Sequence, residues 1–134
     1  MTKRDKIFNK FNGKCAYCGC ELQKGWHIDH LLPLVRSPFT GEQQYPERNN
    51  FDNLMPSCPS CNNYKHSYAI EEFRRLISEL RKQLMLSTQY KISLRYGLIN
   101  EVEKEVKFHY EQVSSNDGNT VLPAVDFSDR YKNI

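Results

Sequence analysis

The sequence lacks any long apolar run. None of its hydrophobic stretches approaches the roughly 20 residues that a helix needs to span a bilayer. The N-terminal M-T-K-R-D-K also lacks the apolar segment of a secretory signal. We therefore expect a soluble protein of the cytoplasm with no membrane partner.

Strong charge imbalance, internal repeats and low-complexity segments are missing too. The chain has 134 residues, and its 19 Lys and Arg against 16 Asp and Glu give a net charge of +3. This length predicts a single domain with one core. We divide it into a basic N-terminal arm (1–14), a core (15–66), a helical extension (67–97) and a C-terminal segment (98–134). A basic arm can follow phosphates, although such runs are often simply solvated.

Cysteine, in contrast, is plentiful, with 5 in the chain. Four of them form two C-x-x-C units, Cys15 with Cys18 and Cys58 with Cys61. Without a secretory signal, this spacing indicates metal binding rather than disulfides. A two-residue gap lets both sulfurs of a unit face one tetrahedral Zn²⁺, and four thiolates leave no position open for a substrate. We predict a structural zinc site and expect Cys20 to be a bystander.

Hydrophobic periodicity predicts a mixture of helices and short strands. A strand is expected at W-H-I-D-H-L (26–31), and F-D-N-L-M-P (51–56) is expected to pair back on it. The second C-x-x-C unit opens a helical stretch, and a longer amphipathic helix follows with Ser67 as its cap. Residues 88–96 fit both a strand and a helix stopped at Gly97. Alternating apolar residues favour a strand near 104–112, and the tail from Ser114 is expected to be irregular.

The stretch G-W-H-I-D-H-L-L-P-L places two histidines and an aspartate in an otherwise apolar strand. Asp29 and His30 are followed by Asn53 and then by Asn62, which directly follows Cys61 and precedes Lys65 by three residues. This order resembles the HNH endonucleases, whose pattern is D-H…N…(H or N)-x-x-K. The specific resemblance covers about residues 15–66. It implies an α+β fold with a ββα-metal core, here stabilised by a four-cysteine zinc site.

The resemblance also implies a metal-dependent DNA endonuclease that hydrolyses phosphodiester bonds of double-stranded DNA. Asp29 and Asn62 would hold a catalytic Mg²⁺ or Mn²⁺, and oxygen donors suit such hard ions. His30 would be the general base, a role that suits histidine because its reference pKa is about 6.5. Asn53 would brace the loop between the strands. Candidate phosphate or DNA contacts are Lys65, His66 and His27.

Each of these residues also has an ordinary structural reading. Asp29 could pair with a nearby cation, His30 could be a core histidine, Asn53 could bond a turn and Asn62 could cap a helix. Together they favour catalysis, but the sequence leaves alternatives open. One is a non-catalytic zinc module that binds nucleic acid or protein, and another is an enzyme with a second, catalytic zinc. Biological role, sequence specificity, nicking against double-strand cleavage, preferred metal and oligomeric state also stay open.

Overall fold

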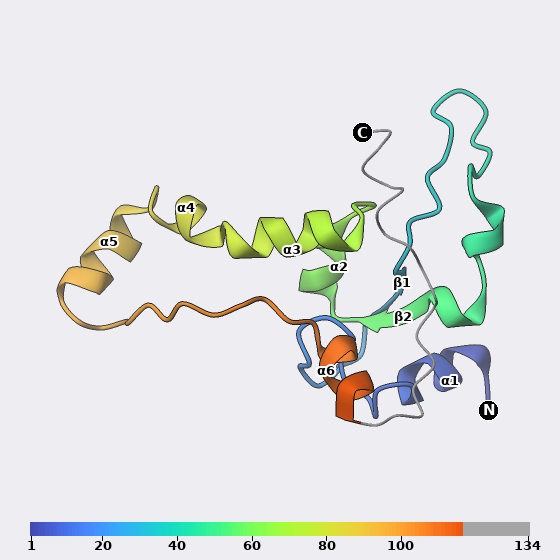
Figure 1. The fold of residues 1–134 in the computed structure, drawn as a ribbon, viewed down its shortest axis with the longest axis horizontal. Helices are drawn as coiled ribbons and strands as arrows, with labels where there is room; N and C mark the ends of the chain where they lie inside the picture. Colours follow the sequence, from blue (N-terminus) through green and yellow to red (C-terminus); the bar gives the residue numbers. More distant parts are fainter. Residues whose placement is uncertain (117–134) are drawn as a thin grey trace.

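The protein has an α+β fold built on a two-stranded antiparallel sheet (Figure 1). The structure, a computed structural model, describes residues 1–116, with side chains to residue 113. Its elements, in chain order, are α1 (Lys3–Asn9), β1 (His27–His30), η1 (Pro46–Arg48), η2 (Phe51–Asn53), β2 (Leu54–Ser57), α2 (Pro59–Lys65), α3 (Ile70–Ser78), α4 (Leu80–Leu84), α5 (Thr88–Arg95) and α6 (His109–Asn116). None of the described helices is long and apolar enough to cross a bilayer.

Helix α1 forms the first part of the predicted basic arm. Thr2 begins it with a capping box, in which its hydroxyl accepts a hydrogen bond from Asp5 N and its own N–H donates to the Asp5 carboxylate. Ile7 on this helix is fully buried. Beyond the helix, Lys10 Nζ donates to the Leu54 carbonyl at 2.7 Å. The arm is therefore packed against the β2 region.

Strands β1 and β2 with helix α2 form the predicted ββα unit. His27 pairs with Ser57 and His30 with Leu54. The second strand begins at Leu54 rather than at the predicted Phe51, because the Asn50 side chain accepts a hydrogen bond from Asn53 N and closes a 3₁₀ turn there. Cys58 caps α2, and α2 packs on β1.

The amphipathic helix predicted from Ser67 is present but differs at both ends. It begins at Ile70, after Ala69, so Ser67 is not the cap. The chain turns at His66, which has a φ of 50°, before the helix starts. The helix is interrupted at Glu79, which separates α3 from α4. Residues 88–95 form α5, which ends before Gly97 with its φ of +71°, so the helical reading is confirmed.

The strand predicted near 104–112 is wrong. Residues 98–108 run back to the core without strand pairing among the described residues, and α6 begins at His109. The alternation instead reflects burial of Phe108 and Tyr110. His109 N and Tyr110 N donate to the carbonyls of Tyr17 and Ala16 at 2.9 and 2.8 Å. Most of the tail predicted to be irregular from Ser114 lies outside the described residues.

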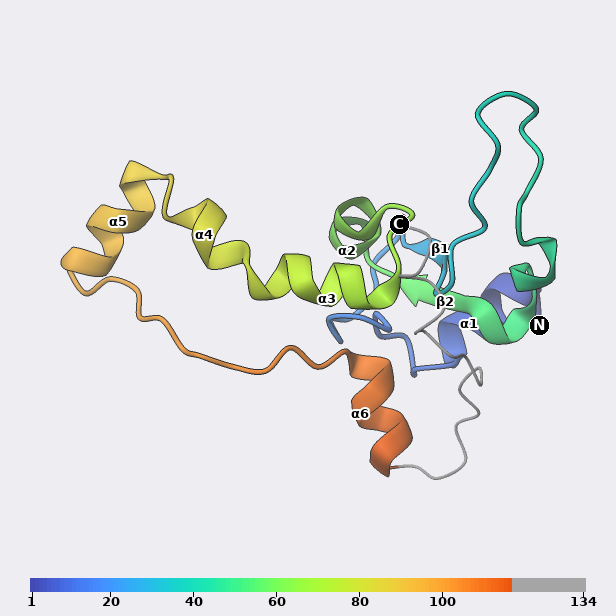
Figure 2. The same cartoon turned by 45° about the horizontal axis from the view of Figure 1, so that its top comes forward.

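The core gathers around the first cysteine pair. In Figures 1 and 2, α3, α4 and α5 extend away from the ββα unit, and the chain returns along residues 98–108 to α6. The buried cluster is made by residues from segment 11–22, from the sheet and the residue after β1, from α3, and from the start of α6 and the residue before it: Phe11, Cys15, Ala16, Tyr17, Leu22, Leu31, Met55, Ile70, Phe73, Phe108 and Tyr110. The sheet and α2 thus lie on this core, where the motif residues are placed.

Candidate metal and catalytic site

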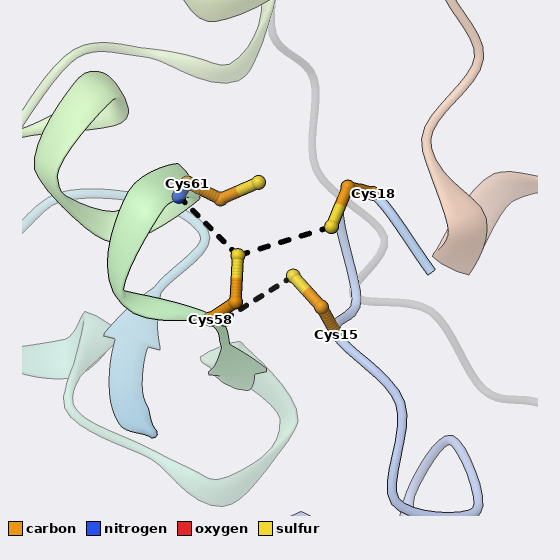
Figure 3. A group of neighbouring side chains, drawn as sticks. All are labelled: Cys15, Cys18, Cys58 and Cys61. Carbon is orange, nitrogen blue, oxygen red and sulfur yellow. Dashed lines mark hydrogen bonds between the residues drawn. The ribbon is translucent and has the colours of Figure 1, made fainter. Parts of the chain in front are cut away.

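The four cysteines of the two C-x-x-C units converge on one point (Figure 3). The sulfur atoms of Cys15, Cys18, Cys58 and Cys61 all lie within 4.8 Å of one another. Cys18 Sγ and Cys58 Sγ are 3.8 Å apart. A tetrahedral ion with Zn–S bonds of about 2.3 Å requires sulfurs about 3.8 Å apart. The donor set and its spacing therefore fit a closed tetrahedral zinc site.

Local backbone geometry prepares these sulfurs for a metal. Cys58 N donates to Cys15 Sγ at 3.3 Å, and Cys61 N donates to Cys58 Sγ at 3.4 Å in the first turn of α2. A hydrogen bond from Cys61 lowers the pKa of the Cys15 thiol to about 4, against the opposing effect of burial. Cys20 is exposed and does not belong to the group of four.

Asp29 lies on β1 and is 8% exposed. Its Oδ2 receives two donors, the Tyr17 hydroxyl at 2.5 Å and Lys65 Nζ at 3.0 Å. Burial and then the charge of Asp29 raise the pKa of Tyr17 well above its usual value, so this hydroxyl stays protonated and can donate. Among the described residues, Oδ1 accepts no hydrogen bond. The carboxylate is therefore anchored by one oxygen.

The expectation that Lys65 contacts phosphate is not met by this structure. Its side chain is fully buried, and Nζ also donates to the His30 carbonyl at 3.0 Å. A buried ammonium that pairs with a carboxylate is not available to a ligand at the protein surface. Lys65 instead ties α2 to two consecutive residues of β1.

His30 is half-buried at the end of β1, and its Nε2 lies 3.1 Å from the Asn49 side-chain oxygen. With that oxygen as acceptor, Nε2 carries the ring proton and Nδ1 is the nitrogen that can accept a proton. The backbone of the next residue is held too, because Leu31 N donates to the Asn53 carbonyl at 2.9 Å.

Asn53 is buried, and its whole side chain is used in hydrogen bonds to the backbone. Its Oδ1 accepts from Leu32 N at 2.8 Å. Its Nδ2 donates to the carbonyls of Leu32 and Arg48 at 2.9 and 2.7 Å. These contacts are those of a brace for the loop that follows His30, and they leave the amide unsuited to hold a metal.

Asn62, His27 and His66 lie around this centre. Asn62 is half-buried on α2, one turn before Lys65, and residues three apart share a helix face. Asn62 and Lys65 therefore lie on the same face of α2. His27 is exposed at the other end of β1, and His66 is exposed beside Tyr68 after α2. Neither histidine contacts Asp29 or the His30 ring in the part of the chain that the structure describes.

Two residues at this centre were not predicted from the sequence. The hydrogen bond from the Tyr17 hydroxyl to Asp29 was missed. Asn49 lies in R-N-N, a stretch that gives no local signal for a contact with His30. Both contacts join residues that lie far apart in the sequence, so no local pattern could reveal them.

Comparison with known proteins agrees with this geometry. The family model described as HNH endonuclease matches residues 15–68. The chain is also similar to YoqL of Bacillus subtilis (strain 168), an SPbeta prophage-derived protein named as a candidate HNH endonuclease. The two are 35% identical over 73 residues, which is 51% of this chain and 30% of that protein. No solved structure matches the chain significantly.

Proposed function

We propose that this chain is a metal-dependent endonuclease that hydrolyses phosphodiester bonds in double-stranded DNA, because residues 15–68 match the family model described as HNH endonuclease. The observation that supports the proposal most directly is the contact between α2 and β1. It joins Asp29 to Lys65, and Asn62 lies one turn before Lys65 on the same helix. Asp29, His30 and Asn62 therefore lie on two elements that pack against each other.

The donors at this site suit a divalent ion as well as zinc. Asp29 Oδ1 and the Asn62 side-chain oxygen are the hard ligands that Mg²⁺ and Mn²⁺ prefer, and such ions commonly take only one or two protein ligands. The four thiolates would hold a structural Zn²⁺. When bound, the divalent ion supplies charge stabilisation for the scissile phosphate and its leaving oxygen.

The residues of the chain have distinct tasks in this reaction. His30 accepts a proton from the attacking water at the ring nitrogen that Asn49 does not bond. Asn49 orients the ring, and Asn53 fixes the backbone after it. His27 and His66 are exposed and available to contact DNA phosphates, which would position the duplex without reading its sequence.

Nicking of a supercoiled plasmid tests this function. We expect cleavage with Mg²⁺ or Mn²⁺, abolished by EDTA, and a loss of about 10²- to 10⁴-fold in the His30→Ala variant. The variant should keep its zinc and its DNA affinity, which serve as controls. A fully active His30→Ala variant would rule out the proposed base.

One observation favours a non-catalytic zinc module that binds nucleic acid. Lys65 already neutralises the charge of Asp29, as in a purely structural ion pair. This alternative predicts DNA binding that persists without any metal-dependent nicking, and it predicts that Asp29→Ala leaves DNA affinity unchanged. The plasmid assay separates the two functions because only the nuclease converts supercoiled DNA to the open circle.

A further inference from the structure

One residue of the first cysteine unit and one residue of the helix that begins at the second unit contact the same oxygen, Asp29 Oδ2. Tyr17 lies between Cys15 and Cys18 in the first unit, and Lys65 lies on the helix that Cys58 and Cys61 begin. Their donors meet at Asp29 Oδ2, at 2.5 and 3.0 Å. The sites expected to hold zinc and the catalytic ion are thus joined by two direct contacts.

The Tyr17 side chain has little freedom to move. Its ring packs edge-on against Phe73, Phe108 and Tyr110, with centroids 5.7, 5.8 and 6.5 Å away. The residue is 2% exposed. A buried, fully bonded polar group of this kind is rigid, because any other orientation would leave its partner without a hydrogen bond. The hydroxyl is therefore a fixed point from which the carboxylate is oriented.

We propose that Tyr17 is a positioning residue that holds Asp29 through Oδ2 and presents Oδ1 to the divalent ion, so that the first cysteine unit sets the affinity of the catalytic metal site. This inference rests on the proposed function, because it assumes that Asp29 binds the ion. Outer hydrogen bonds of this type orient metal ligands, and their removal commonly weakens metal binding about 10- to 100-fold.

The role of the hydroxyl is distinct from that of Lys65. The Lys65 ammonium neutralises the carboxylate, and its positive charge opposes a nearby cation. The Tyr17 hydroxyl is uncharged and directs the carboxylate without repelling the ion. Without it, the carboxylate can rotate and pair both oxygens with Lys65, which would withdraw Oδ1 from the metal. We therefore expect Tyr17 to favour metal binding through orientation alone.

The test is the Tyr17→Phe variant, which removes only the hydroxyl. Mn²⁺ binding is measured by electron paramagnetic resonance on protein of known zinc content. We expect a dissociation constant for Mn²⁺ raised about 10- to 100-fold, with zinc content and circular dichroism unchanged. Plasmid cleavage should need correspondingly more Mn²⁺ but approach the wild-type rate at saturation. Tyr110→Phe, which removes another hydroxyl from the same aromatic cluster, should leave Mn²⁺ affinity unchanged.

The outcomes separate this inference from the proposed function. Unchanged Mn²⁺ affinity in Tyr17→Phe would overturn the positioning role. Loss of zinc in that variant would overturn it too, since the hydroxyl would then serve the fold rather than the carboxylate. If the wild-type protein has no Mn²⁺ site that Asp29→Ala abolishes, the metal site of the proposed function itself fails.

Discussion

Asn53 connects the backbone on both sides of the loop between β1 and β2. Its amide oxygen receives one backbone N–H, and its amide nitrogen donates to two carbonyls. Only asparagine and glutamine carry a side-chain amide, which supplies one acceptor and two donors, and asparagine is the shorter of the two. The residue therefore fixes the path of the chain directly after His30.

Replacing Asn53 with Ala should destabilise the protein by about 2–4 kcal/mol, because it leaves buried backbone groups of Leu32 and Arg48 without partners. Urea unfolding followed by circular dichroism measures the loss. Asn100→Ala is the matched control, since Asn100 is exposed beyond α5 and surface changes usually stay within about 0.5 kcal/mol. Equal stability of the two variants would contradict the bracing role.

At the residue scale, the short spacing between motif residues predicted their contacts better than the type of a single residue did. The two C-x-x-C units predicted which four sulfurs come together, because each pair is preorganised by its own turn. Lys65 was predicted to be a candidate phosphate contact, yet it is fully buried. It pairs with Asp29, which lies on a different element, and the local sequence does not reveal such a contact.

At the scale of the elements, Arg74 joins α3 to the segment that returns before α6. Its guanidinium pairs with Glu71 on its own helix and with Glu111 on α6. It also donates to the Val106 carbonyl at 2.6 Å and lies over the Phe108 ring, 4.7 Å from its centroid. Burial lowers the pKa of Arg74, but the hydrogen bonds that its guanidinium donates to Glu71 and Glu111 raise it above its usual value. Removal of these contacts should loosen residues 106–112.

The Arg74→Lys variant tests this connection. Lysine retains the charge, but its ammonium lacks the planar set of N–H donors with which the guanidinium bonds several acceptors at once. We expect faster hydrogen exchange at the amides of His109, Tyr110 and Gln112, with a local loss of about 1–3 kcal/mol. Arg75→Lys is the matched control. Arg75 pairs with Glu72 and Glu79 on the exposed side of the same stretch, where such pairs contribute about 0–1 kcal/mol. Identical exchange in both variants would contradict the connection.

A helix or strand could be predicted from the sequence where the next elements along the chain bury one of its faces. The hairpin and α2 follow from strand-like runs and a cysteine cap, and α3 follows from apolar spacing. The alternation of Val106, Phe108 and Tyr110 was misread because a chain crossing a core also buries every second residue. The backbone N–H groups of His109 and Tyr110 bond to the carbonyls of Tyr17 and Ala16, and the local sequence does not encode such distant contacts.

At the scale of the whole molecule, the cysteine cluster lies where the N-terminal segment, the sheet, α3 and the returning segment meet. Cys15 belongs to the buried core, and Cys58 and Cys61 pack against it. The sheet has only two strands, and an isolated pair of strands is marginally stable in water. We therefore expect the stability of this α+β fold to depend on a metal bound at the cysteines.

Removing zinc should unfold the described core, because binding of a structural Zn²⁺ contributes roughly 10–16 kcal/mol, which is comparable with the whole stability of a typical domain, about 5–15 kcal/mol. Thermal unfolding by circular dichroism, before and after a strong chelator, measures this. We expect the chelated protein to lose its cooperative transition and to regain it when Zn²⁺ is returned.

The two neighbouring cysteines provide the matched pair for this experiment. Cys18→Ser removes a sulfur of the cluster and should abolish both stoichiometric zinc and the transition. Cys20→Ser changes an exposed thiol outside the cluster and should keep both. If the chelated protein or the Cys18→Ser variant retained a full transition, the hairpin and α2 would be held by apolar packing alone. Asp29 would then be positioned independently of the cysteines.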